Sequence, residues 1–334
     1  MTLAVVISCY RQERFLARTV AALERAFAGH EWEGVVELAV RGDEPLPELP
    51  PRWRVVSAWD AARREPGRAL TPGAGRMLGF TSCGGEWVLF VDPDVEVESA
   101  WVARALDTIA REPRLAAVFG RLEEWFTAGG REWRNARDMY RTGDADRPVD
   151  YLAALAFYRR DALAACGGYD PRLNSDEDFE LGLRLRQRGF ELRSLGMLAG
   201  RHWSAPRPSF SELGRRWRTG ICFGQGQVLR LYLGRPGLVP LLLRQRLYFA
   251  ALGLWGLGVL SLLGALAGFG ARPFLAWLAL PALVIAGMSA KKRSPRLAVH
   301  SLLTWTLNGC GMVVGFFTFP SGARPLTGAG EAAC

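Results

Sequence analysis

Short apolar runs alternate with amphipathic stretches over roughly the first 200 residues of the chain. The run Leu3–Ser8 shows too little alternation for a half-exposed strand and predicts a buried parallel one. Similar runs predict strands at 35–40, 54–58 and 87–91, and a helix is expected over 73–83. Strands that alternate with helices in this way predict a parallel sheet with helices on both faces, in which ligands bind beyond the carboxyl ends of the strands.

The hydrophobic pattern changes near residue 247. Residues 247–269 contain no charged side chain in 23 positions, and a membrane-spanning helix needs roughly 20 such residues. Residues 273–290 and 297–319 are also expected to span. The second of the three is expected to be the weakest, because it is shorter and contains Pro281.

Positively charged side chains flank these spans unevenly. Arginine and lysine lie before the first span and after the second, whereas Arg272 stands alone between them. This bias places the amino-terminal domain in the cytoplasm and makes the protein a multi-pass protein of the inner or plasma membrane. The sequence predicts a cytoplasmic domain at 1–206 and basic interfacial helices at 207–246. A membrane region at 247–320 and a tail at 321–334 follow.

The basic segment 207–246 accounts for much of the net charge of +9. It contains eight arginines and one acidic residue, Glu212, interleaved with aromatic and leucine side chains. Such a segment suits helices that lie in the headgroup layer of an anionic membrane, with a solvated basic linker as the alternative. Membrane lipids are therefore expected partners, and a nucleic acid is not required to explain the charge.

Two carboxylates follow the predicted strand 87–91. Asp92 and Asp94 stand one residue apart with Pro93 between them. Carboxylate oxygens at a strand end can hold Mg²⁺ or Mn²⁺, with phosphate oxygens completing the coordination shell. A polar turn shaped by the proline is the alternative. The six cysteines form no C-x-x-C pair, which argues against zinc and indicates a reducing compartment.

Two further groups of charged residues can complete a site of this kind. Arg76 is expected at the start of its helix, where a cation beside backbone N–H groups can meet a diphosphate. Four acidic residues at positions 176–180 begin another predicted helix, which is more than capping requires. One of them can act as a general base if the fold brings it near an acceptor hydroxyl.

Taken in order, three stretches give the chain a family resemblance. They are VVISCYRQERFLARTVAAL at the start, GAGRMLGFTSCGGEWVLFVDPDVEV in the middle and FYRRDALAACGGYDPRLNSDEDFELGLRLRQRGFEL near the end of the domain. The chain resembles the family-2 glycosyltransferases, and the three stretches occur in order within about the first 200 residues. The resemblance implies a Rossmann-like, GT-A type nucleotide-diphospho-sugar transferase domain with a mostly parallel central α/β sheet, followed here by interfacial helices and about three transmembrane helices.

The resemblance also implies roles for individual residues. Asp92 and Asp94 would form the D-x-D motif, in which Asp92 contacts the ribose and metal and Asp94 the metal that bridges the diphosphate. Asp178 would be the catalytic base, and its neighbour Glu177 would orient or contact the acceptor. Arg76 would lie close to the nucleotide-sugar.

Other residues complete the predicted site. The resemblance places Cys9, Tyr10 and Glu13 at the end of the first strand, beside the nucleotide. His202 is a candidate third metal ligand, with a structural role as the alternative. The chain departs from the family at VRGDEP, where Asp43 or Glu44 is left to recognise the base, so the nucleotide is not defined.

These features together predict a membrane-anchored, metal-dependent enzyme. It would move one sugar from a nucleotide-diphosphate donor to a hydroxyl of a lipid-linked or glycan acceptor, with inversion, in cell-envelope glycan synthesis. A single transfer is favoured because the segment ELGRRW has Leu213 where processive synthases have glutamine. The alternatives are a polyprenyl-phosphate monosaccharide synthase and a non-catalytic membrane subunit that retains the fold.

Overall fold

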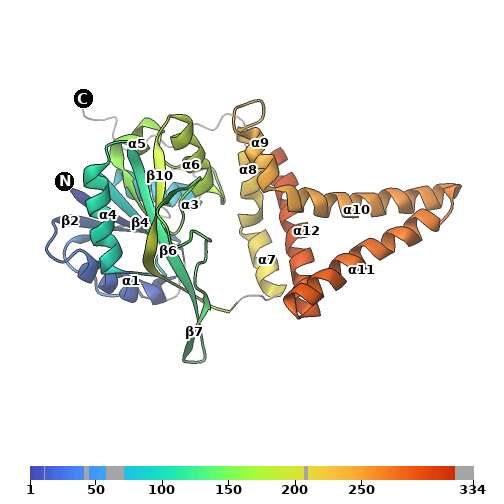
Figure 1. Cartoon of the computed structure of the whole chain (residues 1–334), viewed down its shortest axis with the longest axis horizontal. Helices are drawn as coiled ribbons and strands as arrows, with labels where there is room; N and C mark the ends of the chain where they lie inside the picture. The colour runs from blue at the N-terminus through green and yellow to red at the C-terminus, as the bar shows by residue number, and fades with distance from the viewer. Residues whose placement is uncertain (11, 41–44, 58–70, 207–209, 320–334) are drawn as a thin grey trace. The chain divides into compact units, whose positions relative to one another are not determined.

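A computed structural model describes residues 1–10, 12–40, 45–57, 71–206 and 210–319 (Figure 1). The chain divides into two compact units, and their described parts are residues 1–206 and 210–319. The first unit is an α/β domain and the second is helical. Each unit is described by itself.

The α/β unit is built around one mixed sheet with the strand order β3-β2-β1-β4-β9-β6-β10-β5. The strands are β1 (Leu3–Tyr10), β2 (Trp32–Val40), β3 (Trp53–Ser57), β4 (Trp87–Val91), β5 (Val95–Val97), β6 (Leu115–Ala128), β7 (Arg131–Ala136), β8 (Arg147–Pro148), β9 (Leu155–Arg159) and β10 (Glu191–Ser204). Strands β3, β2, β1 and β4 run parallel, as expected from the sequence. Strand β9 is antiparallel to both of its neighbours, β4 and β6.

Helices cover both faces of the sheet. They are α1 (Glu13–Ala26), α3 (Pro72–Thr81), α4 (Ser99–Arg111), α5 (Arg160–Ala165) and α6 (Glu177–Gln187). Successive side chains of a strand point to opposite faces. Phe157 of β9 packs against Phe27 of α1 and Trp101 of α4, whereas its neighbour Tyr158 packs against Phe90 on the other face.

Helix α3 lies on the same face as Tyr158. A Cβ atom added to Gly79 of α3 would stand 2.3 Å from the side chain of Val6 in β1, and Val6 pairs with Phe90 across the parallel register. The glycine therefore lets α3 approach the sheet closely. Strand β4 is buried at all five positions. The residues that follow it, beginning with Asp92, therefore start from a well-packed part of the core.

The helical unit contains the three helices that were expected to span. It comprises α7 (Phe210–Arg218), η1 (Ile221–Phe223), α8 (Gly224–Leu231), α9 (Leu238–Arg244), α10 (Arg246–Gly264) with η2 (Ala265–Phe269), α11 (Arg272–Lys292) and α12 (Pro295–Thr318). Three segments are long and apolar enough to cross a membrane: Arg246–Phe269, Arg272–Lys292 and Pro295–Thr318. The second segment is the shortest, at 21 residues, whereas the third has the lowest mean hydropathy, and Pro281 lies inside α11.

The basic segment before the spans is helical and partly buried. Helix α8 and η1 pack on α12 at glycine positions, where an added Cβ at Gly226 would lie 1.8 Å from the carbonyl oxygen of Met312. Gly315 of α12 similarly faces the carbonyl group of Phe223. Residues 221–229 are therefore anchored to α12, while α7 has no buried residue.

Candidate active site at the end of β4

The two carboxylates of the D-P-D sequence leave β4 on a tight turn. The N–H group of Val95 donates to the carbonyl oxygen of Asp92 at 3.1 Å, with Pro93 in the second position of the turn, where its fixed φ is favourable. The N–H group of Asp92 donates to the carbonyl oxygen of Ala154. The turn thus fixes Asp92, whose side chain is 30% exposed, beside Asp94, whose side chain is 3% exposed.

The sheet register brings a histidine to this turn. Strand β5 starts directly after Asp94 and pairs antiparallel with β10, so that His202 stands opposite Val95. The N–H group of Trp203 donates to the carbonyl oxygen of Asp94 at 2.8 Å. The buried His202 therefore places its Nε2 atom 3.4 Å from Oδ1 of Asp94.

Asp92, Asp94 and His202 together form a candidate metal site. One ligand atom from each lies within 4.8 Å of the others. The Nδ1 atom of His202 is buried and has no hydrogen-bond partner among the residues that the structure describes. Two carboxylates and an imidazole fit a divalent cation such as Mn²⁺ or Mg²⁺. His202 lies 110 positions after Asp92 in the sequence.

Arg76 connects the metal site to the acidic helix. Thr71 caps α3 by accepting from the N–H group of Ala74, and Pro72 starts the helix. Arg76 is the fifth residue of α3, not at its start as expected, and it is buried. Its Nη2 atom donates to Oδ1 of Asp92 at 2.9 Å, and its Nη1 atom lies 3.0 Å from Oδ1 of Asp178.

Arg76 also donates to the carboxylate of Glu177 and lies over the ring of Tyr169 at 5.5 Å. Burial alone would lower the pKa of Arg76, but Asp178, Glu177 and Asp92 raise it well above its ordinary value. The guanidinium group therefore stays charged and holds three carboxylates together.

Helix α6 presents the buried Glu177 and the partly buried Asp178 in its first turn. Asp176 precedes the helix in the left-handed conformation, with φ of 61°, which aspartate tolerates better than most residues. Asp178 is 16% exposed and accepts a hydrogen bond from the hydroxyl group of Tyr169 at 3.3 Å. Glu177, directly before it, is the carboxylate that pairs with Arg76.

Burial raises the pKa of Asp178 to about 8, and it also raises the pKa of Glu177. Arg76 opposes both shifts, whereas the charges of the neighbouring carboxylates add to them. Three carboxylates around one guanidinium carry more negative charge than it can neutralise, so a proton is retained near neutral pH. Such a group is suited to proton transfer at physiological pH.

The structure brings together six of the residues predicted from the sequence. They are Arg76, Asp92, Glu177, Asp178 and, through the metal cluster, Asp94 with His202 beside it. Cys9 is fully buried in the hydrophobic core at the end of β1, and its role beside the nucleotide stays a prediction. The side chains of Tyr10 and Glu13, together with Asp43 and Glu44, lie outside the described residues.

Sequence reasoning missed two contacts of this site. Gln12 donates through Nε2 to Oδ2 of Asp94 at 2.6 Å, and Tyr169 contacts both Arg76 and Asp178. The position of Gln12, two residues after the end of the first strand, was a usable signal, because β1 and β4 are parallel neighbours whose carboxyl ends meet. Tyr169 gives no such signal, since it lies in the turn after α5.

A family model matches part of the chain. Residues 63–167 match the family model described as glycosyl transferase family 2. This segment includes Arg76, Asp92 and Asp94, whereas Asp178 and His202 lie beyond it. The comparison with curated proteins gives no match.

Solved glycosyltransferases share the fold. Mannosyltransferase PcManGT from Pyrobaculum calidifontis, in complex with GDP-Man and Mn²⁺, has a TM-score of 0.53 at 14% identity, covering 94% of this chain and 85% of that chain. TarS 1–349 from S. aureus with UDP-GlcNAc has a TM-score of 0.48 at 16% identity, covering 70% and 72% respectively. GalNAc-T7 with UDP, GalNAc and Mn²⁺ has a TM-score of 0.47 at 17% identity, covering 66% and 48%.

The chain spans 64% of the length of a second TarS 1–349 structure. Identities this low show the fold alone, and PcManGT is the one of these structures with a TM-score above 0.5. The protein is thus an α/β chain of GT-A type with three candidate membrane helices. Residues 63–167 match the family model of the family-2 glycosyltransferases, and the fold is of the GT-A type shared with PcManGT.

Proposed function

We propose that the protein is a metal-dependent, inverting glycosyltransferase that moves one sugar from a nucleotide-diphosphate donor to a hydroxyl group of a lipid-linked or glycan acceptor. The observation that carries the proposal is the contiguous arrangement of the candidate metal ligands, Arg76 and Asp178. Arg76 bridges Asp92 and Asp178 through separate nitrogen atoms at 2.9 and 3.0 Å. A metal-bound diphosphate and a general base can therefore act on the same sugar.

Asp92, Asp94 and His202 would hold the cation. The chemistry that Mg²⁺ or Mn²⁺ supplies when bound is neutralisation of the charge that grows on the diphosphate leaving group. Gln12 holds Asp94 from the side of β1, and the β5–β10 register holds His202. A side-chain hydrogen bond thus positions Asp94, and the pairing of two strands positions His202. Both limit the reorganisation of these ligands during the reaction.

Asp178 would remove the proton of the acceptor hydroxyl. The bond between the acceptor oxygen and C1 of the sugar forms as the bond between C1 and the diphosphate breaks, and the proton moves to the carboxylate of Asp178. One such displacement inverts the anomeric carbon and needs no covalent intermediate. Asp178 would accept the proton in its ionised form, which becomes populated as the pH approaches its pKa of about 8.

The three candidate spans support an acceptor that resides in the membrane. A covalent anchor keeps the catalytic domain at the surface and raises the effective concentration of membrane lipids around it. The flanking arginines and lysines favour a cytoplasmic catalytic domain and an inner or plasma membrane. A lipid-linked saccharide would reside in the membrane and could be reached by a catalytic domain on the cytoplasmic side.

Two alternatives make different demands on Asp178. A polyprenyl-phosphate monosaccharide synthase uses a phosphate that is already ionised, so its acceptor needs no general base. A non-catalytic subunit has no need of a buried carboxylate with a raised pKa. The buried, tyrosine-bonded Asp178 favours the hydroxyl acceptor over both.

Thermal stabilisation by donors tests the proposal. The full chain in lipid nanodiscs is heated with Mn²⁺ and each of a panel of UDP-, GDP- and dTDP-sugars, alongside Asp92→Asn/Asp94→Asn. We expect one nucleotide class to raise the melting temperature of the wild type and not of the double variant. Absence of stabilisation by every donor and metal would instead favour the non-catalytic subunit.

A further inference from the structure

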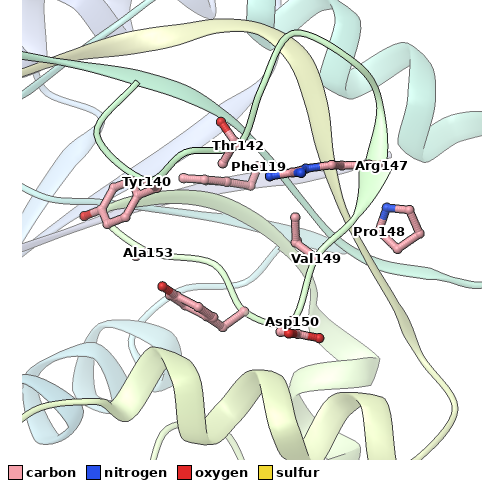
Figure 2. A pocket seen from close by; sticks show the side chains of 9 residues that line it. Phe119, Tyr140, Thr142, Arg147, Pro148, Val149, Asp150 and Ala153 are labelled. Carbon is pink, nitrogen blue, oxygen red and sulfur yellow. The ribbon is translucent and has the colours of Figure 1, made fainter. Parts of the chain in front are cut away.

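A cavity of about 310 Å³ opens beside the candidate active site (Figure 2). It lies between β6 and the segment that carries β8, and its lining combines aromatic, charged and hydroxyl side chains. Tyr140, Thr142, Arg147 and Asp150 are arranged around one hollow in Figure 2. Its volume is at the lower end of the range for ligand pockets, ~300–1,000 Å³, which suits one small ring rather than a whole nucleotide-sugar.

The cavity adjoins the reacting centre. Ala153 lines this cavity and also the small crevice formed by Arg76, Asp92 and Asp178. Tyr140 is close enough to the carboxylates for their charge to act on it: burial raises the pKa of its hydroxyl group, and Asp92 and Asp178 raise it further. A molecule in the cavity can therefore extend to the base.

The sheet order places the cavity away from the expected nucleotide end of the site. Strand β4, which delivers Asp92, lies between β1 on one side and β9 on the other, with β6 beyond β9. The residues expected beside the nucleotide follow β1, whereas Phe119 of β6 lines the cavity. The cavity and the nucleotide end therefore lie on opposite sides of Asp92, as the two substrates of a transfer reaction require.

The lining has the chemistry of a sugar-binding pocket. Tyr140 packs edge-on against Phe119 with ring centroids 5.7 Å apart, and Tyr151 packs against Phe179 of α6 at 5.3 Å. Both rings are thus held by aromatic neighbours, and both end in hydroxyl groups. Pyranose rings present apolar C–H faces and polar edges, which match aromatic side chains combined with a few placed hydrogen-bonding groups.

Arg147 supplies donors at the rim of the cavity. One of its N–H groups donates to the carbonyl oxygen of Arg141 at 2.6 Å, which fixes the guanidinium group. A guanidinium group carries five N–H donors in a planar fork. The remaining donors suit neighbouring hydroxyl groups of a sugar or a carboxylate attached to it.

We infer that this cavity binds a sugar residue of the acceptor, so that the acceptor is a saccharide rather than a bare polyprenyl phosphate. The inference rests on the proposed function, because it assigns the substrate class of the same site. Helix α6 links the two parts: a Cβ atom added to Gly182 would stand 2.6 Å from the carbonyl oxygen of Asp150. The helix that carries Asp178 is therefore packed directly on the wall of the cavity.

Binding to saccharides tests this assignment without requiring turnover. Fluorescently labelled full chain in lipid nanodiscs is applied, with Mn²⁺ and with or without UDP or GDP, to an array of immobilised mono- and oligosaccharides. Arg147→Ala and Tyr151→Ala are compared with Arg111→Ala and Trp133→Ala, which remove the same kinds of side chain at exposed positions outside the cavity. Tyr151→Phe is a milder variant for the case that Tyr151→Ala does not fold.

We expect the wild type and both controls to bind a defined set of saccharides. Arg147→Ala should weaken that binding by about tenfold, the effect of losing one hydrogen bond to a charged group, and Tyr151→Ala should weaken it by at least as much. Binding to no saccharide, or binding that both cavity variants leave unchanged, would overturn the assignment.

Donor cleavage by the same preparations separates this assignment from the proposed function. We expect the controls Arg111→Ala and Trp133→Ala to release nucleoside diphosphate from the donor at the wild-type rate, because both positions lie outside the cavity and the candidate metal site. A cavity variant that loses donor cleavage and keeps saccharide binding would show that the cavity serves the donor. Wild-type saccharide binding without any donor cleavage would contradict the proposed function and leave the saccharide pocket standing.

Discussion

Arg76 is the residue on which the charge balance of the site depends. It contacts the carboxylates of Asp92, Glu177 and Asp178 with a single guanidinium group. Because one positive charge faces three acids, at least one proton is retained, and burial places the pKa of Asp178 at about 8. The contacts of Arg76 thus hold the three carboxylates close together. The negative charge of a donor diphosphate is expected to rearrange these contacts.

Asp178→Asn should abolish transfer and alter the pH dependence of stability. The pKa of Asp178 in the folded protein, about 8, exceeds its ordinary value of 3.8. The folded state therefore binds more protons between these values, and the resulting stability is lost as the pH rises from about 4 through about 8. Asparagine removes this dependence, so the melting temperature of the variant relative to wild type should rise between pH 5 and pH 9.

Thermal unfolding at several pH values, with Asp107→Asn as an exposed control on α4, measures this effect. A difference in melting temperature that is the same at both pH values would contradict a raised pKa. Full transfer activity in Asp178→Asn would remove its assignment as the base.

His202→Ala should weaken Mn²⁺ binding while the fold is kept. Loss of one of three protein ligands is expected to cost at least about tenfold in affinity, comparable to the loss of a supporting contact to a metal ligand. Gln12→Ala should have a smaller effect, because Gln12 acts on the metal through its hydrogen bond to Asp94. Isothermal titration with Mn²⁺ in the presence of nucleotide measures both, and His30→Ala, at an exposed position, is the matched control.

Unchanged Mn²⁺ affinity in His202→Ala would assign this histidine a structural role. The order of effects is also informative, since an affinity lowered more by Gln12→Ala than by His202→Ala would contradict the assignment of ligand and supporting residue.

The sequence predicts most residues of the site but not their contacts. Asp92 and Asp94 could be identified because they follow an apolar run, and a strand end is a common place for ligands. The pairing of Arg76 with Glu177 joins residues 101 positions apart, and no local pattern records such a contact. Tyr169 was missed for the same physical reason, because only the fold brings it close to Arg76 and Asp178.

At the scale of single elements, β5 and β10 determine where His202 lies. The three-residue strand β5 pairs with β10 at Gly200, Arg201 and His202. A shift of that register by one residue would turn His202 to the other face of the sheet. The short strand therefore ties the D-P-D turn to its third candidate ligand.

The elements that were predicted correctly are those with strong local patterns. The apolar run 87–91 corresponds to β4 residue for residue, and the expected strands at 35–40 and 54–58 lie within or overlap β2 and β3. Beyond β4 the parallel pattern gives way to antiparallel pairing, as in β9 between β4 and β6. Both partners of β9 are distant in sequence, so pairing across the sheet decides its direction.

Gly182→Ala should disturb the contact between α6 and the segment at Asp150 and Tyr151. Alanine normally stabilises a helix by about 1 kcal/mol relative to glycine. Here its Cβ atom would meet backbone atoms at 2.6 and 2.9 Å, so α6 must shift. We expect a lower melting temperature and a lower transfer rate, because the shift moves Asp178.

Gly214→Ala is the matched control, since Gly214 is also helical and has no atom within 4 Å of an added Cβ. It should leave the transfer rate unchanged. Equal effects of the two substitutions, measured by transfer rate and thermal unfolding, would contradict the close packing at Gly182.

At the scale of the whole molecule, charge and hydrophobicity are divided between the two units. The acidic site residues lie in the α/β unit, whereas the basic segment and the three candidate spans belong to the helical unit. The net charge of +9 therefore does not describe the active site. An α/β domain joined to three candidate membrane helices suits the membrane-resident acceptor proposed above.

The most direct test of this account is the release of nucleoside diphosphate from the donor by the full chain in lipid nanodiscs. The wild type should cleave one nucleotide-sugar in the presence of Mn²⁺ and stop when the metal is chelated. Asp92→Asn/Asp94→Asn should lose the activity, and Asp107→Asn should retain it. Release that persists in the double variant or after chelation would contradict a metal-held diphosphate as the basis of the reaction.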